Sequence, residues 1–164
     1  MHSKAFTLIE LAITIFLAGL LGSLGYFYLN TFTIKKLQYK TTVESHMNLI
    51  ESMVFQCKSL SEQFPKELNA STNASNSLLT ELECNTTMPY PLNGGRNGFV
   101  PVPPSGFTPY RATETGNEFY VITTTENNST QHEALQKLIV NYTSQQATLE
   151  SNATSTTFKF YLSR

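Results

Sequence analysis

Few residues of this 164-residue chain could do chemistry, and they are scattered. His2, His46 and His132 lie far apart, and Cys57 and Cys84 lack the spacing of a metal site. No glycine-rich phosphate loop follows a strand-like segment. The sequence therefore predicts no catalytic residues, no metal ion and no cofactor, and we do not expect an enzyme.

Glu10 is the acid that stands out, because it opens a run of 19 residues, 11–29, with no charge. About 20 residues of apolar helix span the hydrocarbon of a bilayer. An ionisable side chain there is costly, so it must be neutral or find a cation, and it indicates function. The alternative is a glutamate that reaches back to the bilayer interface. The run is also longer than the apolar region of a cleaved secretory signal, about 7–15 residues.

The two cysteines have a second possible role. An even number of cysteines in an exported domain favours a disulfide, here between Cys57 and Cys84. The alternative is two buried, reduced thiols.

The elements that would position these residues begin with a long helix. Past the apolar run, apolar residues recur at mostly three- and four-residue steps, which predicts an amphipathic helix with one buried stripe. No proline occurs between Phe6 and Phe64, and Pro65 supplies a stop. The two segments together predict one helix of roughly 80 Å, more than a domain of this size can bury. The stripe consists of Ile34, Leu37, Val43, Met47, Ile50, Val54, Cys57 and Leu60.

The second half of the chain predicts a small antiparallel sheet against this helix, an α+β fold. Residues 118–125 and 156–162 have the aromatic and β-branched composition of strands. Thr130 and Glu133 have capping-box spacing, which predicts a short helix over 130–140. Residues 78–82 fit a helical turn. We expect a polar loop at 69–77 and a Pro- and Gly-rich loop at 89–109.

Residues 4–11, KAFTLIEL, resemble the class III signal of type IV pilins and type II secretion pseudopilins. In that family a short basic leader is cut before an N-methylated Phe, and a Glu four residues later is kept. The resemblance implies cleavage between Ala5 and Phe6 and methylation of Phe6. It also implies that Glu10 pairs with the new amino group of a neighbouring subunit and so sets register. The family usually has Gly where Ala5 stands, and often a mid-helix Pro near the position of Phe27.

The resemblance also implies a type IV pilin-like fold and a domain order. We expect a leader at 1–5, a transmembrane and assembly helix at 6–32, its amphipathic continuation at 33–64 and a periplasmic or extracellular globular part at 65–164. The implied location is the bacterial inner membrane, single-pass with the C-terminal domain in the periplasm, and then a pilus or pseudopilus.

The function that the resemblance implies is structural. The chain would be a minor pilin or pseudopilin whose partners are prepilin peptidase, other pilin or pseudopilin subunits and an inner-membrane assembly platform. Two alternatives stay open. One is an adhesin or DNA-uptake tip on the same anchor, and the other is a single-pass membrane protein that never polymerises.

Asparagine supplies a further pattern, because Asn-x-Ser/Thr sequons occur at seven positions. Four of them have Glu two residues upstream, which resembles the extended acidic sequon of bacterial N-glycosylation. Our hypothesis is N-glycosylation at these four, and the alternative is compositional bias in an Asn- and Thr-rich chain. The four are Asn69, Asn85, Asn128 and Asn152, and the others are Asn73, Asn127 and Asn141.

Charge excludes some classes of partner. Charged residues make up 14% of the chain, against about a quarter in typical domains. The formal net charge is −1, and the basic residues form no cluster with interleaved aromatics, so we do not expect nucleic-acid binding. All 12 acidic residues are Glu, which disfavours a calcium loop.

Overall fold

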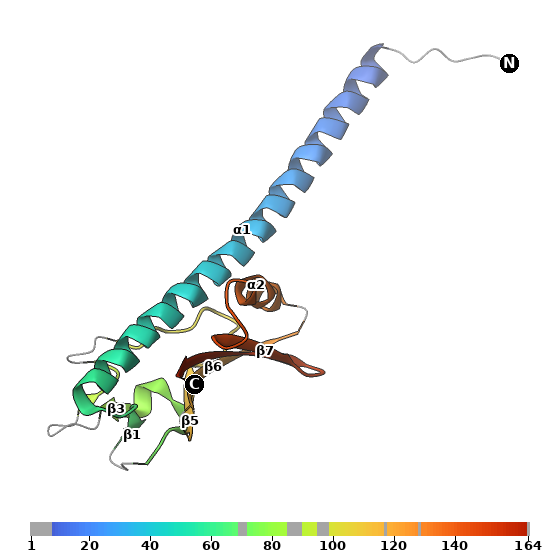
Figure 1. The fold of residues 1–164 in the computed structure, drawn as a ribbon. Coiled ribbons are helices and arrows are strands. Elements are labelled where there is room, and N and C mark those ends of the chain that lie inside the picture. Colours follow the sequence, from blue (N-terminus) through green and yellow to red (C-terminus); the bar gives the residue numbers. More distant parts are fainter. Residues whose placement is uncertain are drawn as a thin grey trace. The chain divides into compact units, whose positions relative to one another are not determined.

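The computed structural model describes residues 8–68, 72–84, 90–94, 99–116, 118–127 and 129–163. The chain divides into two units, Met1–Lys35 and Lys36–Arg164. Helix α1, Leu8–Ser61, contributes to both units (Figure 1). Its unbroken course follows from the sequence, since no residue in it is a proline.

The second unit contains two antiparallel sheets. The larger has five strands in the order β2-β5-β6-β8-β7, and the smaller has three in the order β1-β3-β4. A short 3-10 helix, η1, precedes β3, and helix α2 connects β6 to β7. The bounds are β1 Lys66–Glu67, β2 Ser75–Leu78, η1 Leu79–Glu81, β3 Leu82–Cys84, β4 Tyr90–Pro91, β5 Arg111–Thr115, β6 Glu118–Glu126, α2 Thr130–Ile139, β7 Ala147–Ser151 and β8 Ser155–Ser163.

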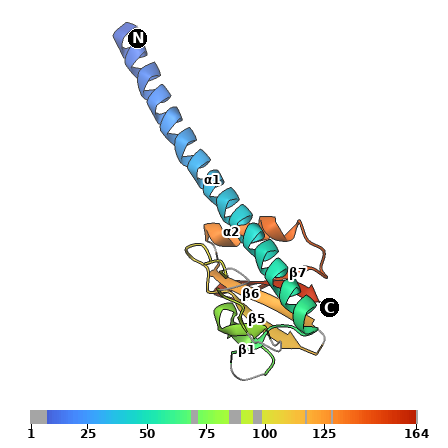
Figure 2. The ribbon, with the colours of Figure 1, turned by 90° about the vertical axis from the view of Figure 1, so that its left-hand side faces the viewer.

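The core of this unit lies between the helices and one face of the five-stranded sheet. Residues alternate between the two faces of a strand, and those of β6 and β8 that face the helices are buried. The C-terminal half of α1 packs over this face, as Figure 2 shows. The chain is therefore α+β, with a long N-terminal helix packed on antiparallel sheet, as the sequence predicts. The largest fully buried side chains include Val43, Met47, Ile50 and Val54 of α1, Phe119 and Val121 of β6, Leu135 and Leu138 of α2 and Phe158 of β8.

The predicted stripe of α1 is correct in its middle and wrong at its ends. Ile34, Leu37 and Leu60 are exposed, and Met53, which the stripe left out, is buried. Successive residues turn by about 100° around a helix, so the six-residue step from Leu37 to Val43 does not stay on one face. Periodic spacing therefore located the helix, while its contact with the sheet decided which side chains are buried.

The predicted elements of the second half are largely confirmed. The strands at 118–125 and 156–162 are β6 and β8, the helix at 130–140 is α2, and the helical turn is η1. The capping box is wrong, because Ser129 is the N-cap and its Oγ accepts a hydrogen bond from the His132 amide at 3.1 Å. Glu133 instead forms an ion pair with Lys36 of α1.

The predicted polar loop at 69–77 is wrong where β2 begins at Ser75. Ser75–Leu78 pairs with β5, and its Ser77 is buried. This strand is rich in Ser and Asn and has one large apolar residue. It therefore lacks the β-branched and aromatic residues that indicate a strand in a sequence. Strands β1, β3, β4, β5 and β7 have two to five residues each and were not predicted either.

A disulfide joins Cys57 of α1 to Cys84 of β3, which confirms that prediction. Both residues are fully buried, and their Cα atoms lie 5.4 Å apart. The bridge ties the helix to the smaller sheet, which has only short strands of its own.

We predict that Cys57→Ala or Cys84→Ala lowers the free energy of unfolding of the second unit. The bond closes a loop with a sequence separation of 27, and cross-links of that size stabilise by about 3–4 kcal/mol through the entropy of the unfolded chain. Denaturant unfolding of the full chain in detergent measures the loss. The double variant is the control, because both substitutions remove one bond and their effects should not add. Unfolding midpoints equal to that of the wild-type protein would contradict a stabilising bond.

Helix α1 ends in a conformation that suits glycine. The Glu62 amide donates to the Lys58 carbonyl at 2.8 Å, and Glu62 has a φ of 60°. Side chains other than Gly lose roughly 1–2 kcal/mol in this left-handed region. Helices commonly end with Gly there.

We predict that Glu62→Gly stabilises the second unit by about 0.5–1 kcal/mol, because relief of strain outweighs the flexibility that Gly adds to the unfolded chain. Thermal unfolding of both proteins measures the gain. Glu62→Ala keeps a Cβ and is the matched control, for which we expect no gain. A Gly variant no more stable than the Ala variant would contradict the strain.

Candidate functional site

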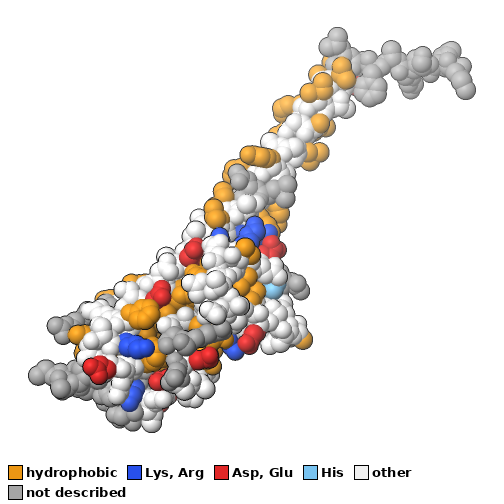
Figure 3. All heavy atoms as spheres, in the orientation of Figure 1, with side chains coloured by type: hydrophobic (Ala, Val, Ile, Leu, Met, Phe, Trp, Pro, Cys, Tyr) orange, Lys and Arg blue, Asp and Glu red, His pale blue; other side chains and the backbone are white. Residues whose placement is uncertain are grey.

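The candidate site of the N-terminal unit is the surface of α1 itself. Every side chain described at 9–28 and 31–35 is exposed within the single chain, including Ile9 at 72% and Leu21 at 71%. Figure 3 shows hydrophobic side chains along this part of the helix. Gly19, Gly22 and Gly25 also lie open, since a Cβ on any of them would meet nothing within 4 Å. A surface this apolar requires lipid or another apolar surface as its neighbour.

By length and composition, α1 is the helix of the described chain that could cross a membrane. Glu10 lies in its first turn. At the other end of the uncharged run, aromatic side chains and one lysine border a shallow hollow, the combination typical of the membrane interface. The residues that line it are Leu24, Phe27, Tyr28, Thr31, Phe32 and Lys35.

Several predicted site residues lie outside the described part of the chain. They are Ala5 and Phe6 of the processing site and three candidate glycosylation sites, Asn69, Asn85 and Asn128. The roles proposed for them stay predictions.

Asn152 lies in the tight turn between β7 and β8, where it is exposed. Its Oδ1 accepts from the Thr154 and Ser155 amides at 2.9 and 2.8 Å, so the side chain fixes the turn. Glu150, two residues upstream, pairs with Lys159 at 2.7 Å and is held on the strand beside it. The sequon therefore occupies a surface turn with its acid in a defined position.

Asn127 shows a different use of a sequon asparagine. Its Nδ2 donates to the Asn152 carbonyl at 2.6 Å, and its Oδ1 accepts from the Thr156 hydroxyl at 2.6 Å. Thr156 is fully buried, and its hydroxyl also contacts His132 Nδ1 at 2.8 Å and Ser151 Oγ at 3.0 Å. Both polar atoms of the Asn127 side chain are therefore hydrogen-bonded within the fold, which disfavours glycosylation of this residue.

Glu67, the acid of the Asn69 sequon, is also held by neighbours. It accepts hydrogen bonds from the Ser77 hydroxyl at 2.5 Å and the Thr72 hydroxyl at 3.1 Å. The Ser77 hydrogen bond, followed by that from Thr72, lowers the pKa of Glu67 below its usual value. Its carboxylate is therefore ionised at neutral pH.

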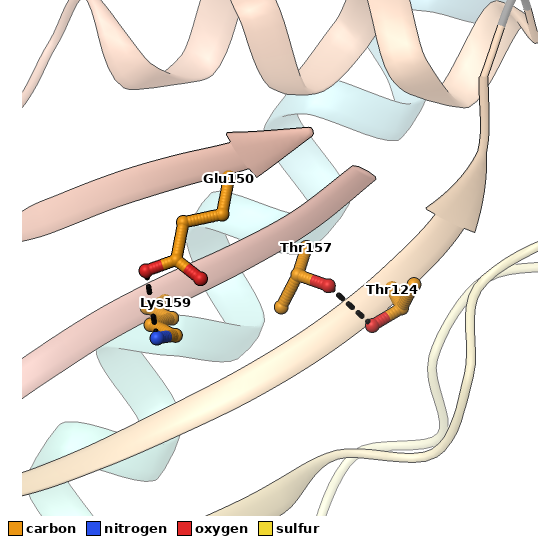
Figure 4. A network of polar contacts seen from close by, with 4 residues as sticks. All are labelled: Thr124, Glu150, Thr157 and Lys159. Carbon is orange, nitrogen blue, oxygen red and sulfur yellow. Dashed lines mark hydrogen bonds and ion pairs between the residues drawn. The ribbon is translucent and has the colours of Figure 1, made fainter. Parts of the chain in front are cut away.

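The outer face of the five-stranded sheet carries the polar contacts drawn in Figure 4. Thr124 and Thr157 of adjacent strands meet through their hydroxyls at 3.0 Å, and Lys159 pairs with Glu150. Lys159 also lies 5.6 Å from the centroid of the Tyr120 ring. Among these residues, sequence reasoning singled out Glu150 alone, as the acid of the Asn152 sequon. It did not predict the contact of Thr124 with Thr157, because that contact joins strands far apart in the chain.

The described histidines of the second unit make contacts within the fold. In the described residues, no three His, Cys, Asp or Glu side chains gather where a metal ion could bind. His46 and His132 are each occupied within the fold, His46 by the Tyr110 hydroxyl at 2.9 Å. The described contacts of the second unit are those of core packing, a disulfide and hydrogen bonds at its surface.

We predict that natively expressed protein carries glycans at Asn152 and at the other acidic sequons, and that Asn127 stays bare. Glycopeptide mass spectrometry measures the occupancy of each site. Glu150→Gln should abolish modification of Asn152. Lys159→Met is the matched control, since it breaks the same ion pair but keeps the acid, and it should leave the glycan in place. Four bare acidic sequons would contradict the hypothesis.

No family model, curated protein or solved structure matches this chain. Its function is therefore inferred from its own residues and their arrangement.

Proposed function

We propose that this chain is a structural subunit, a minor pilin or pseudopilin, of a type IV pilus or type II secretion filament. Prepilin peptidase removes its leader, and the subunit assembles through its N-terminal helix with the help of an inner-membrane platform. The observation that supports this most directly is the exposed, uncharged stretch of α1 with Glu10 at its start.

This stretch suits two successive environments. In the membrane, its exposed Leu, Ile and Phe side chains contact lipid. In a filament, the same side chains pack against helices of other subunits. Full removal of one such side chain from water stabilises by about 1.5–3 kcal/mol. The segment is therefore stable in either place and unstable in water, so it can pass from lipid to filament without losing its apolar surroundings.

Glu10 supplies what apolar packing does not, namely a fixed register. Cleavage between Ala5 and Phe6 frees an α-amino group, and N-methylation leaves it positively charged. This group pairs with Glu10 of a neighbouring subunit, and in a filament core the pair neutralises two charges that are costly to bury. A slipped neighbour leaves one charge unpaired, which costs about 3–5 kcal/mol.

The disulfide supports the proposed orientation. Such bonds persist in oxidising compartments such as the periplasm, and the Cys57–Cys84 bond lies in the second unit. Lysines usually flank the cytoplasmic end of a spanning helix. Here Lys35, Lys36 and Lys40 follow the uncharged run, and Lys4 is the one lysine before it. Charge bias alone would therefore not give this orientation. The second unit is therefore exported, and the N-terminus stays on the cytoplasmic side for cleavage.

We predict that Glu10→Leu still inserts in the membrane but assembles at least about 100-fold less, because it leaves the neighbour's amino group unpaired. Membrane fractionation measures insertion, and the yield of sheared filaments measures assembly. Glu118→Leu removes an exposed acid of the second unit and is the matched control, for which we expect normal assembly.

Mass spectrometry of the mature N-terminus tests the processing step, and we expect a methylated Phe6. Normal assembly of Glu10→Leu would contradict the register role. A mature chain that still begins at Met1 would instead fit a single-pass membrane protein that never polymerises.

A further inference from the structure

The chain between β4 and β5 contains a proline-rich segment whose backbone conformation follows from its own sequence. Residues 99–105, with the sequence FVPVPPS, are all described and lie in no α-helix or strand. Each proline fixes φ at about −65°, and a residue that precedes a proline is confined to extended conformations. Residues 100–104 therefore favour polyproline II, which has about three residues per turn. We call residues 99–105 the proline segment.

Side-chain exposure in the proline segment repeats with this period of three. Phe99, Val102 and Ser105 are exposed, Phe99 at 77% and Val102 at 83%. Val100 lies on a different edge and is buried in the core. The three prolines are half-buried. The segment thus has one edge against the domain and an outward edge formed by Phe99, Val102 and Ser105.

Contacts near both ends hold the proline segment in place. The Val100 amide donates to Asn93 Oδ1 at 2.9 Å. The Ser105 carbonyl accepts from Nε2 of Gln131, in α2, at 2.9 Å. The segment is therefore shaped by its own fold before any partner binds, which lowers the entropy lost on binding.

The outward edge is apolar and has no use within the described fold. Phe99, Val102 and Val140 are the most exposed large apolar side chains described in the second unit. No residue from 97 to 110 is charged. Two prolines three residues apart, Pro101 and Pro104, lie beside this edge. Proteins recognise such preformed polyproline II segments in grooves lined by aromatic side chains.

We propose that the proline segment is a docking site for a different protein, which binds it in a groove lined by aromatic side chains. Phe99 and Val102 enter the groove, and the prolines supply the rigid shape that the groove fits. The docking site does not depend on the proposed filament function, because none of its residues lies on α1.

Site-specific cross-linking in cells that produce the full chain tests the docking site. A photoreactive benzoylphenylalanine replaces Phe99, or Val140 as the matched control, since Val140 is exposed at 81% and lies at the end of α2. We expect position 99 to give a cross-link to a different protein, within a peptide that contains Trp, Tyr or Phe, and position 140 not to give it. The proposal is overturned by no product at 99, by a product that joins two copies of this chain, or by partner peptides without aromatic residues.

Further substitutions in the chain with benzoylphenylalanine at position 99 show whether the proline segment itself is bound. Val102→Ser should lower the yield of the cross-link at least about 10-fold, because it removes an apolar side chain from the groove. Its melting temperature should equal that of the parent chain, since Val102 is exposed. Val140→Ser is the matched control and should leave the yield unchanged.

The double variant Pro101→Ala, Pro103→Ala tests the rigid shape, because it keeps Phe99 and Val102 but frees the backbone between them. We expect the yield to fall roughly 4- to 30-fold, the cost of ordering two residues that proline had restricted. A yield that stays at the parent level in this variant or in Val102→Ser would overturn the proposal.

Discussion

Burial of one face of α1 against the five-stranded sheet is the interaction on which the second unit depends. Val43, Met47, Ile50 and Val54 leave water together with Phe119 and Phe158 of the sheet. Because hydrophobic burial is the dominant favourable term in folding, this contact fixes which side of the helix faces inward. The exposed side chains of this part of α1 take their places relative to it. The disulfide then joins the same helix to the smaller sheet.

The N-terminal stretch of α1 is exposed on all sides instead of buried on one. Every described side chain at 9–28 is exposed, its apolar ones included. One helix thus combines a segment whose apolar residues are buried by the fold with a segment whose apolar residues need an external partner. The filament subunit that we propose requires this combination, because its anchoring surface has to stay available for new neighbours.

Polar residues complete the end of the sheet near α2. Asn127, Thr156, His132 and Ser151 form a hydrogen-bonded group around the fully buried Thr156 hydroxyl. Buried polar groups are tolerable when they are satisfied, and such a group specifies one arrangement of the β7–β8 turn relative to β6. Asn127 therefore uses both polar atoms of its side chain within the fold, whereas the exposed Asn152 fixes its own turn through Oδ1.

The sequence by itself determined the course of α1, the strands β6 and β8 and helix α2, and it favoured the pairing of Cys57 with Cys84 that the structure shows. These features depend on local periodicity, on the absence of proline and on an even cysteine count, all of which are readable along the chain. The N-terminal motif and its roles at Ala5, Phe6 and Glu10 also come from the sequence and stay predictions. Tertiary structure alone decided that Leu37 and Leu60 are exposed, that Ser129 rather than Thr130 caps α2, and that Ser75–Leu78 is a strand. The physical reason is that burial and strand pairing depend on neighbours distant in sequence, and the local pattern of residues does not specify them.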